Sequence, residues 1–426
     1  MSRAITYSQA LKGIYSLDKF GSRLGLGRIS IILKHLGHPE KSYNCILVGG
    51  SNGKGSTTEF IGSILSAQGL RTGTYYSPQV EEFPERFRIN SRNASKGEIA
   101  SAYSKVFSVC RKHAIRATFF EVVTAMALEI FRARKVEFAV LEVGLGGRLD
   151  AVNAVEPEMS ALTSVSLEHT TVLGKTIPAI AREKCGIARK GKSLVCGFLS
   201  GEAKAAVKKE CAIIGAIPIF ADEQVRVGKL SEKGGKYSFA ASFRGKSYSV
   251  SLSAPGKFQV GNSCAALAAA QLLGASKQAI ESGLQSCAPK FRLQQLSLRP
   301  RVIADCAHNP EAALALSSEL SRVQEKRKVL LFSAMDDKDY PQVLRTLSPH
   351  FSHLVLCEVS LSRSAGLPSF FAAAKPHFCS IELVKNPSRA LANAKKAAGK
   401  NGAVVVAGSI YLLAELFGRD KIRLAQ

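Results

Sequence analysis

The chain has 426 residues, of which 46% are hydrophobic and 21% are charged. These values exclude a disordered chain and predict two or three domains that need no disulfide staples. The 58 Lys and Arg residues outnumber the 33 Asp and Glu residues and give a formal charge of +25. This charge excludes a neutral or acidic protein and favours an anionic partner, which could be a nucleotide, a nucleic acid, a membrane surface or a polyacid.

The ten cysteines are spread along the chain without a Cys-x-x-Cys pair, which argues against a zinc ribbon or a thioredoxin-type site. Most lie in apolar or Ala-rich segments, where free cysteine acts as a small hydrophobic residue, as in a reducing cytosol. The first twenty residues lack the apolar core of a signal peptide, and no apolar run approaches the roughly 20 residues that span a bilayer. We therefore expect a cytoplasmic protein with no membrane partner.

Short apolar runs alternate with helical patterns in the first half of the chain. A strand is predicted at 45–48, before a Gly-Gly pair, and a helix at 56–69, where apolar residues recur three and four positions apart. Further buried strands are predicted at 138–143 and 160–165. This alternation is typical of a parallel sheet covered by helices, so the sequence predicts an α/β fold.

The middle of the chain has a different pattern. Aromatic and polar residues alternate between glycine turns at 223–252, which predicts antiparallel hairpins inserted in the first domain, and an Ala-rich helix is predicted next. The strand and helix alternation then restarts, with a helix beginning at Glu311 and strands predicted at 302–304, 329–332, 354–357 and 403–407. The Pro289 region and the polar Gln294-Gln295 pair are consistent with a linker. We therefore predict domains at 1–288 and 289–426.

The segment 49–57, after the first strand, reads Gly-Gly-Ser-Asn-Gly-Lys-Gly-Ser-Thr. Glycines let backbone N–H groups surround phosphate oxygens, and the N-terminus of the next helix adds partial positive charge. Lys54 can reach a terminal phosphate, and the hydroxyl of Ser56 or Thr57 can approach phosphate or Mg²⁺. The strict Walker pattern is not met, so a glycine turn with a surface lysine is the alternative. The flanking strand and helix favour phosphate binding.

Three further residues are candidates on weaker patterns. Glu142 ends a predicted strand, where a carboxylate faces the ligand crevice of α/β folds and suits the hard ion Mg²⁺, although a hydrogen-bonded loop carboxylate is the alternative. His169 follows another strand, but a lone histidine is more often structural, and imidazole is an uncommon Mg²⁺ ligand. Lys184, taken by itself, would be a lysine on a helix surface.

Several segments together resemble the folylpolyglutamate and dihydrofolate synthases, which belong to the ATP-dependent amide ligases that include the muramyl peptide ligases. Each segment is moderately specific, and their order over nearly the whole chain favours the folate branch over the muramyl branch. They are GSNGKGS at 50–56, YSP at 76–78 with ERFRIN at 85–90, LEVGLGGRLDAVN at 141–153, LEHT at 167–170 with REKCGI at 182–187, DCAHNP at 305–310, AMDDKD at 334–339 and GSIYL at 408–412.

This resemblance implies an architecture and a reaction. Residues 1–288 would form the ATP-binding central domain of Mur-ligase type, a P-loop ATPase-type domain with a mostly parallel sheet and a small antiparallel insert. Residues 289–426 would form the glutamate-ligase domain, a C-terminal Rossmann-like α/β domain. A carboxylate of dihydropteroate or of a reduced folate would attack ATP, and L-glutamate would attack the acyl phosphate. The resemblance further implies bifunctional activity, a monomer and no nucleic-acid partner.

The resemblance also implies roles for individual residues. ATP would contact Asn52, Gly53, Lys54, Gly55, Ser56, Thr57, Asn262, Lys290 and Asp305; Mg²⁺ would bind Ser77, Glu142 and His169; the pterin would meet Phe120, Glu121 and Asp150; and catalysis would involve Lys54, His308 and a carbamylated Lys184. The carbamate is carboxylate-like and can support a bound metal. Several positions depart from the family; among them, Glu168 replaces its usual Asp, and Lys290 replaces its ATP-contacting Arg. Arg292 is a nearby alternative, because a lysine does not reproduce the guanidinium fork.

Two other functions fit parts of the sequence. A muramyl-type amino-acid ligase would share the phosphate-loop chemistry. A P-loop nucleic-acid-binding protein would explain the charge of +25, but it would need basic residues interleaved with aromatic ones, and we find no recognition motif of that kind. Dihydrofolate synthase and folylpolyglutamate synthase activities use the same motifs and remain alternatives to each other.

Overall fold

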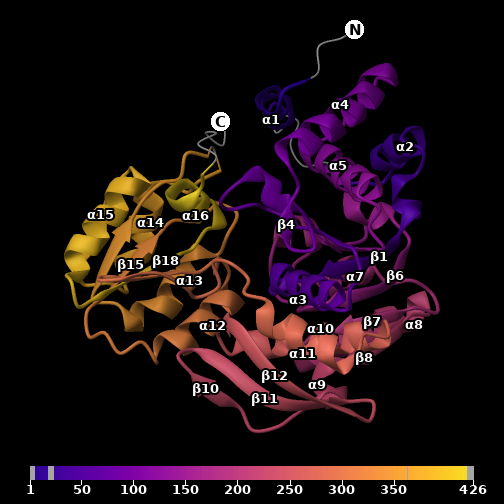
Figure 1. The fold of residues 1–426 in the computed structure, drawn as a ribbon. Coiled ribbons are helices and arrows are strands. Elements are labelled where there is room, and N and C mark those ends of the chain that lie inside the picture. The colour runs from indigo at the N-terminus through magenta and orange to yellow at the C-terminus, as the bar shows by residue number, and fades with distance from the viewer. Residues whose placement is uncertain (1–4, 18–23, 362, 420–426) are drawn as a thin grey trace.

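A computed structural model describes residues 5–17, 24–361 and 363–419 of the chain. Three sheets organise these residues, with strand orders β4-β3-β2-β5-β1-β6-β7-β8, β10-β11-β12 with β9 beside β11, and β13-β14-β18-β15-β16-β17. In Figure 1 the eight-stranded sheet lies to the right with its helices, the six-stranded sheet lies to the left, and the small antiparallel sheet lies below. The fold therefore has two α/β parts and an insert.

The N-terminal part contains the first two sheets. Its strands are β1 (Asn44–Gly49), β2 (Thr72–Tyr75), β3 (Phe87–Ile89), β4 (Arg92–Asn93), β5 (Phe138–Glu142), β6 (Pro157–Leu162), β7 (Ser193–Cys196), β8 (Ile217–Phe220), β9 (Arg226–Val227), β10 (Ser231–Lys233), β11 (Lys236–Phe243) and β12 (Lys246–Pro255). Its helices are α1 (Tyr7–Tyr15), α2 (Gly27–His35), α3 (Lys54–Ala67), α4 (Lys96–Lys112), α5 (Phe119–Ala133), α6 (Thr170–Leu173), α7 (Ile177–Cys185), α8 (Gly201–Ile214), α9 (Ala221–Gln224), α10 (Phe258–Leu272) and α11 (Lys277–Ser286). Strands β2, β5, β1, β6, β7 and β8 run parallel.

The C-terminal part contains the six-stranded sheet. Its strands are β13 (Gln294–Leu298), β14 (Arg301–Ala304), β15 (Lys328–Phe332), β16 (His353–Leu356), β17 (Ile381–Leu383) and β18 (Ala403–Ala407). Its helices are α12 (Pro310–Leu320), α13 (Tyr340–Leu347), α14 (Leu367–Ala374), α15 (Pro387–Ala398) and α16 (Ile410–Phe417). All strand pairs are parallel except β13 with β14.

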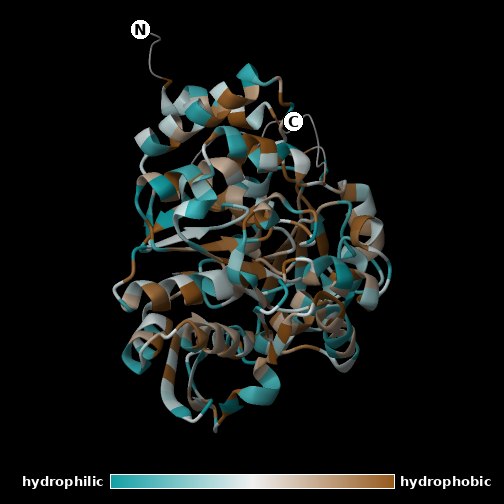
Figure 2. Ribbon diagram, turned by 90° about the vertical axis from the view of Figure 1, so that its right-hand side faces the viewer, coloured by the Kyte–Doolittle hydropathy of each residue, from teal (hydrophilic) through white to brown (hydrophobic). Residues whose placement is uncertain are grey.

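Strand β1 shows why helices cover both faces of the eight-stranded sheet. Leu47 packs into a core with residues of α1, α2, α4 and α5, whereas Ile46 and Val48 pack into a second core with α3, α10 and α11. Successive side chains of a strand point to opposite faces, so a continuous apolar run requires an apolar partner on each side. The helices in Figure 2 alternate hydrophobic and hydrophilic residues, as expected for helices that cover a sheet with one face.

The structure confirms the predicted α/β class and the antiparallel insert. Side chains of β11 alternate between exposed and buried, as the aromatic spacing predicted. The predicted helix at 56–69 is α3, but it begins two residues earlier, at Lys54. The reason is Gly53, whose φ of 85° ends the loop in a left-handed conformation directly before the helix.

The prediction that Gln294-Gln295 belongs to a linker is wrong. These residues open β13, which pairs antiparallel with β14 at the edge of the six-stranded sheet. An edge strand tolerates polar side chains, so its sequence resembles a loop. The predicted domain boundary between residues 288 and 289 falls between α11 and β13, and we keep it as a proposal.

All ten cysteines are free, and nine are buried, as expected for small hydrophobic residues. Within the described parts of the chain, no helix is both long enough and apolar enough to cross a bilayer.

Candidate active site

The phosphate loop between β1 and α3 is supported by the segment that follows β6. Gly50 has φ of 142°, and a Cβ atom there would lie 2.0 Å from Thr163 Oγ1. The backbone N–H of Asn52 donates to Ser164 Oγ at 2.8 Å. At Gly53, a Cβ atom would lie 2.3 Å from Asn262 Oδ1. Thr163 and Asn262 therefore lie so close to the loop that only glycine, which has no Cβ atom, fits at positions 50 and 53.

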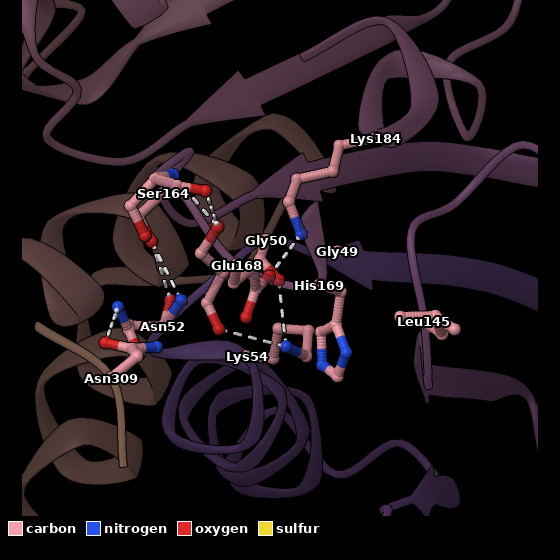
Figure 3. Close-up of polar contacts among 12 residues, drawn as sticks. Gly49, Gly50, Asn52, Lys54, Leu145, Ser164, Glu168, His169, Lys184 and Asn309 are labelled. Atoms are coloured by element: carbon pink, nitrogen blue, oxygen red, sulfur yellow. Dashed lines mark hydrogen bonds and ion pairs between the residues drawn. The ribbon is translucent and has the colours of Figure 1, made fainter. Parts of the chain in front are cut away.

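Lys54 folds back over this loop. Its Nζ donates to Gly50 O at 2.8 Å and to Ser51 O at 3.1 Å. Figure 3 shows Lys54 beside Gly50. Thr57 is the first residue whose N–H bonds within this segment, to Gly53 O, so the preceding N–H groups of the first turn have no partner along the helix. An ammonium group and free helix N–H groups at one place form an anion site.

The hydroxyls of Ser56 and Thr57 lie at the first turn of α3, next to the phosphate loop. Both residues are buried, Ser56 Oγ accepts from Gln259 Nε2 at 3.3 Å, and Thr57 Oγ1 has no partner. The predicted approach of either hydroxyl to phosphate or Mg²⁺ therefore stays a prediction. The backbone N–H of Ser56 is the group of this pair that suits an anion.

The C-terminal part contacts the phosphate loop directly. Asn309 Nδ2 donates to Asn52 Oδ1 at 2.9 Å, and Asn52 Nδ2 donates to Glu311 Oε2 at 2.5 Å. Asn309 is buried and caps α12 by accepting from Ala312 N. This contact could not be predicted from the sequence, because the two asparagines are 257 positions apart. Both nevertheless lie in motifs that carry the family resemblance, at 50–56 and 305–310.

Glu142 faces the first turn of α3. A Cβ atom on Gly55 would lie 3.7 Å from both Glu142 carboxylate oxygens and 3.8 Å from a terminal nitrogen of Arg292. Ser77 N donates to Glu142 Oε2 at 3.1 Å. Burial raises the pKa of Glu142 to about 7, and the Lys54 ammonium opposes this rise. Two of the predicted metal ligands therefore lie together beside the phosphate loop.

Lys290 and Arg292 lie in different surroundings. Lys290 is 43% exposed and forms ion pairs with Glu81 and, at 3.5 Å, with Glu85. Arg292 lies near Asp305, whose oxygens accept from the backbone N–H groups of Leu293 and Ala307, each at 2.8 Å. Burial raises the pKa of Asp305, and Arg292 opposes this rise. Of the two cations, Arg292 therefore lies beside the other candidate ATP contacts.

Lys184 is buried, contrary to the helix-surface position that its local sequence suggests. Its Nζ lies 2.7 Å from Glu168 Oε1, and both side chains are almost fully covered. Burial lowers the pKa of Lys184 to about 8, against the opposing effect of Glu168. Burial alone would raise the pKa of Glu168, but the Lys184 and Lys54 ammonium groups lower it well below its usual value.

His169 lies at the start of α6 and contacts the C-terminal part. Its Nε2 is 3.0 Å from Lys338 Nζ, and its Nδ1 is 3.6 Å from Asp337 Oδ2. Burial, followed by the Lys338 ammonium, lowers the pKa of His169 to about 4, so the ring is neutral at pH 7. Lys54, Glu168, His169 and Lys184 line one small pocket with Gly50 and the loop at 143–146 (Figure 3).

The candidate metal ligands are Ser77, Glu142 and His169. Within residues 5–17, 24–361 and 363–419, no group of three or more His, Cys, Asp or Glu side chains is arranged to hold a metal. The candidate set is of a different kind, because only two of its three members are of these residue types and the third is a serine. The ammonium on His169 Nε2 shows that this nitrogen faces a cation. The buried Glu142 carboxylate beside Ser77 suits a hard ion, so the residues fit a divalent metal.

His308 has a defined tautomer. Its Nδ1 lies 2.8 Å from the carbonyl oxygen of Cys306, and a carbonyl only accepts, so Nδ1 carries the proton and Nε2 has a lone pair. Burial lowers the pKa of His308 to about 4. The ring is therefore a neutral acceptor at pH 7.

The three predicted pterin contacts surround the loop after β5. Phe120 packs so closely on Gly144 that a Cβ atom there would lie 2.6 Å from its ring. Glu121 forms the capping box of α5 with Thr118, and Arg28 Nε lies 2.9 Å from its carboxylate. Asp150 accepts three backbone N–H groups, from Gly144 at 3.1 Å, Leu145 at 2.8 Å and Val152 at 2.9 Å. These residues shape the loop, and Asp150 has most of its acceptor capacity in use.

The raised pKa of the buried Asp150 carboxyl should be visible in how stability depends on pH. Burial raises its pKa to about 6, against backbone hydrogen bonds that lower it. The folded state therefore holds this proton more tightly than the unfolded state, and stability falls as pH rises from about 4 to about 6. The difference in unfolding free energy between wild type and Asp150→Asn should shrink by up to about 3 kcal/mol over that range. Urea unfolding of both proteins at pH 4, 5, 6 and 7 measures it; a constant difference would contradict the assignment.

Comparison with known proteins gives a consistent result. The family model of the Mur ligase middle domain matches residues 48–270, and that of the Mur ligase glutamate ligase domain matches residues 291–410. A probable bifunctional folylpolyglutamate synthase/dihydropteroate synthase of Halobacterium salinarum is 34% identical over 96% of this chain, and this chain spans about half the length of that relative, 51%. A dihydrofolate synthase/folylpolyglutamate synthase of Bacillus subtilis is 30% identical over 97% of this chain and 99% of its own.

Solved structures agree. Folylpolyglutamate synthase of Mycobacterium tuberculosis, complexed with ADP and AMPPCP, superposes with a TM-score of 0.90, at 28% identity, over 97% of this chain and 99% of its own. A bifunctional folylpolyglutamate synthase/dihydrofolate synthase with Mn, AMPPNP and L-glutamate bound gives a TM-score of 0.84, at 30% identity, over 97% and 98% of the two chains.

Proposed function

The chain belongs to the Mur ligase family, in its folylpolyglutamate and dihydrofolate synthase group, and on this basis we propose that it joins L-glutamate to a folate-type acceptor at the expense of ATP. The acceptor is dihydropteroate, a reduced folate or both. The relatives and structures named above are folate enzymes, which favours this function over a muramyl-type ligase.

One observation carries the proposal. The phosphate loop of the N-terminal part and the 305–310 segment of the C-terminal part meet through the Asn52 and Asn309 amides. An acyl phosphate hydrolyses in water, so a ligase needs its nucleotide and amine sites to close on each other. Because one chain supplies both sides of this contact, we propose that it acts as a monomer.

The residues of the chain divide the work as follows. Lys54 and the first N–H groups of α3 hold the ATP phosphates while the acceptor carboxylate attacks the γ-phosphorus and ADP leaves. The glutamate amine then attacks the acyl carbon, and phosphate leaves. The amine must lose a proton. His308 Nε2 has a lone pair that would accept it, and His308 belongs to the 305–310 segment that contacts the phosphate loop. Its lowered pKa makes this transfer a transient step before the proton passes to phosphate or solvent.

A divalent metal with ATP belongs to this proposal, and a related structure contains Mn with AMPPNP. Ser77, Glu142 and His169 would hold it, and we propose Mg²⁺ as the ion. When bound, it would neutralise charge on the transferring phosphoryl group. Asn262, packed against Gly53, and Asp305, beside Arg292, would contact the rest of the nucleotide.

Carbamylation of Lys184 remains a proposal. The reaction with CO₂ needs a neutral amine, and a pKa of about 8 leaves roughly a tenth of the amine neutral at pH 7. The Glu168 carboxylate at 2.7 Å opposes it, because the carbamate would place a second anion there. We therefore expect the carbamate only with a bound metal to offset the two charges, and the mass of the Lys184 peptide in native digests reports it.

The function is tested by product mass. Protein is incubated with ATP, Mg²⁺ and L-glutamate, with either dihydropteroate or tetrahydrofolate as acceptor. We expect ADP release that depends on the acceptor, and a product heavier by one glutamyl residue. Ligation of only one acceptor would assign one activity; ADP release with neither folate, but with a cell-wall nucleotide precursor, would overturn the proposal.

The two candidate cations can be separated by substitution. We expect Arg292→Gln to lower kcat/KM for ATP about 10²-fold, since a cation directed at developing phosphate charge is removed. Lys290→Gln should lower kcat/KM for ATP much less, because this substitution removes only ion pairs with Glu81 and Glu85 at a more exposed site. Steady-state kinetics on both variants, with melting curves to check folding, measures the difference. A larger loss in Lys290→Gln would return the ATP contact to Lys290.

A further inference from the structure

The loop between β15 and α13 reaches from the C-terminal part to His169. Lys338 Nζ lies 3.0 Å from His169 Nε2, and Asp337 Oδ2 lies 3.6 Å from the other ring nitrogen, Nδ1. The same Asp337 oxygen is 3.5 Å from Lys338 Nζ. The imidazole therefore lies between an anion and a cation that adjacent residues of the other part supply, and no role proposed above uses either residue.

The contact with Lys338 determines which ring nitrogen carries the proton. An ammonium group has three donors and no acceptor, so Nε2 must accept and cannot carry hydrogen. A neutral ring then carries its proton on Nδ1, the nitrogen that faces Asp337. A carboxylate near one ring nitrogen with a lone pair directed outward from the other is the arrangement that metal-binding histidines use.

The same contact places a positive charge on the lone pair that a metal would use. Lys338 is only 13% exposed in its side chain, so the ammonium is held at this position and does not extend into solvent. An ammonium group and a metal ion cannot both occupy one lone pair. Binding of the ion at His169 therefore requires Lys338 to move away.

We propose that the Asp337–Lys338 pair controls the metal site from the C-terminal part: Asp337 orients the His169 ring, and Lys338 occupies the cation position on Nε2 and competes with the divalent ion. This inference rests on the metal role proposed for His169. Asp337 prepares the ligand, and Lys338 lowers its apparent affinity, because the metal binds only the fraction of molecules in which the ammonium has left. Metal loading is thereby coupled to the contact between the two parts of the chain.

Metal binding tests the competition. Mn²⁺ alone is titrated into nucleotide-free protein, and free Mn²⁺ is followed by its EPR signal. The variants are His169→Ala, Lys338→Gln and the double variant, with Lys326→Gln as a control that removes an equal charge from an exposed position of the same part. We expect Lys338→Gln to bind Mn²⁺ about three- to tenfold more tightly, and His169→Ala to bind at least tenfold more weakly. The gain from Lys338→Gln should disappear in the His169→Ala background.

Three other outcomes separate the possible failures. If Lys338→Gln binds like wild type while His169→Ala loses affinity, the competition is rejected and the metal role of His169 stands. If Lys338→Gln gains equally with and without His169, or if Lys326→Gln gains as much, the effect is one of general charge and the competition is again rejected. If His169→Ala binds Mn²⁺ like wild type, the metal role itself fails and this inference fails with it.

The part played by Asp337 has its own readout. Ring ¹⁵N shifts of metal-free protein, labelled at histidine and assigned with His169→Ala, report which nitrogen of His169 is unprotonated. We expect Nε2 in wild type, and a mixture of both tautomers in the Asp337→Asn/Lys338→Gln protein, since neither neighbour then fixes the proton. Lys338→Gln alone should keep Nε2 unprotonated, because Asp337 still faces Nδ1. A mixture in Lys338→Gln alone would reject the orienting role of Asp337.

Discussion

Lys54→Ala is expected to lower the rate of ATP-dependent ligation at least about 10³-fold while the fold stays intact. The substitution removes the ammonium that lies over the phosphate loop and donates to Gly50 O and Ser51 O. It also removes a charge that lowers the pKa of Glu142 and of His308. Without it, more of the Glu142 carboxyl is protonated at pH 7, so the metal site weakens together with phosphate binding.

The measurements for Lys54→Ala are acceptor-dependent ADP release, nucleotide affinity by calorimetry and thermal unfolding. Lys209→Ala, an exposed lysine in the middle of α8, is the matched control and should keep wild-type activity. The melting temperature of Lys54→Ala should stay within a few degrees of wild type, because only two hydrogen bonds at the surface of the loop are lost. Ligation within tenfold of wild type would remove Lys54 from the catalytic site.

The local parts of this fold could be predicted because their signals lie within a few residues. Strand β1, the glycine loop and α3 follow one another within residues 44–67, and each is marked by its own apolar spacing or glycines. Strand β13 could not be predicted, because its Gln294 and Gln295 acquire a strand conformation only by pairing with Ala304 and Ile303. Edge strands carry little apolar pattern of their own.

In the candidate site, too, the features set by neighbouring residues could be predicted, whereas contacts between distant residues could not. The glycines and Lys54 could be predicted from sequence because the loop chemistry needs those residue types in one run. The burial of Lys184 could not, because it depends on Glu168, which lies 16 residues earlier and approaches only after α7 packs. The contacts of His169 with Lys338, and of Asn52 with Asn309, join residues more than 160 positions apart. Only the resemblance to a family suggested that these segments belong together.

Gly50→Ala is expected to destabilise the protein by about 3 kcal/mol or more and to weaken nucleotide binding at least tenfold. Two causes act together: φ of 142° is unfavourable for alanine, and the added Cβ would lie 2.0 Å from Thr163 Oγ1 and 3.0 Å from the backbone nitrogens of Thr163 and Ser164. Those nitrogens belong to the segment directly after β6, where Thr163 N is held by a hydrogen bond to Gly49 O at 2.9 Å. The loop must therefore move away from its support, and the N–H groups that face phosphate move with it.

A second glycine separates backbone strain from crowding. Gly69 also has a positive φ, 90°, but a Cβ atom there would meet nothing within 4 Å. Gly69→Ala should therefore cost only about 1 kcal/mol and leave nucleotide affinity as in wild type. Adding Thr163→Ala to Gly50→Ala removes the nearest clashing atom and should restore part of the stability, but not all, because the backbone nitrogens remain. Urea unfolding and nucleotide calorimetry on the four proteins measure these differences; equal losses in Gly50→Ala and Gly69→Ala would show that φ alone, and not the close support of the loop by Thr163, requires glycine at position 50.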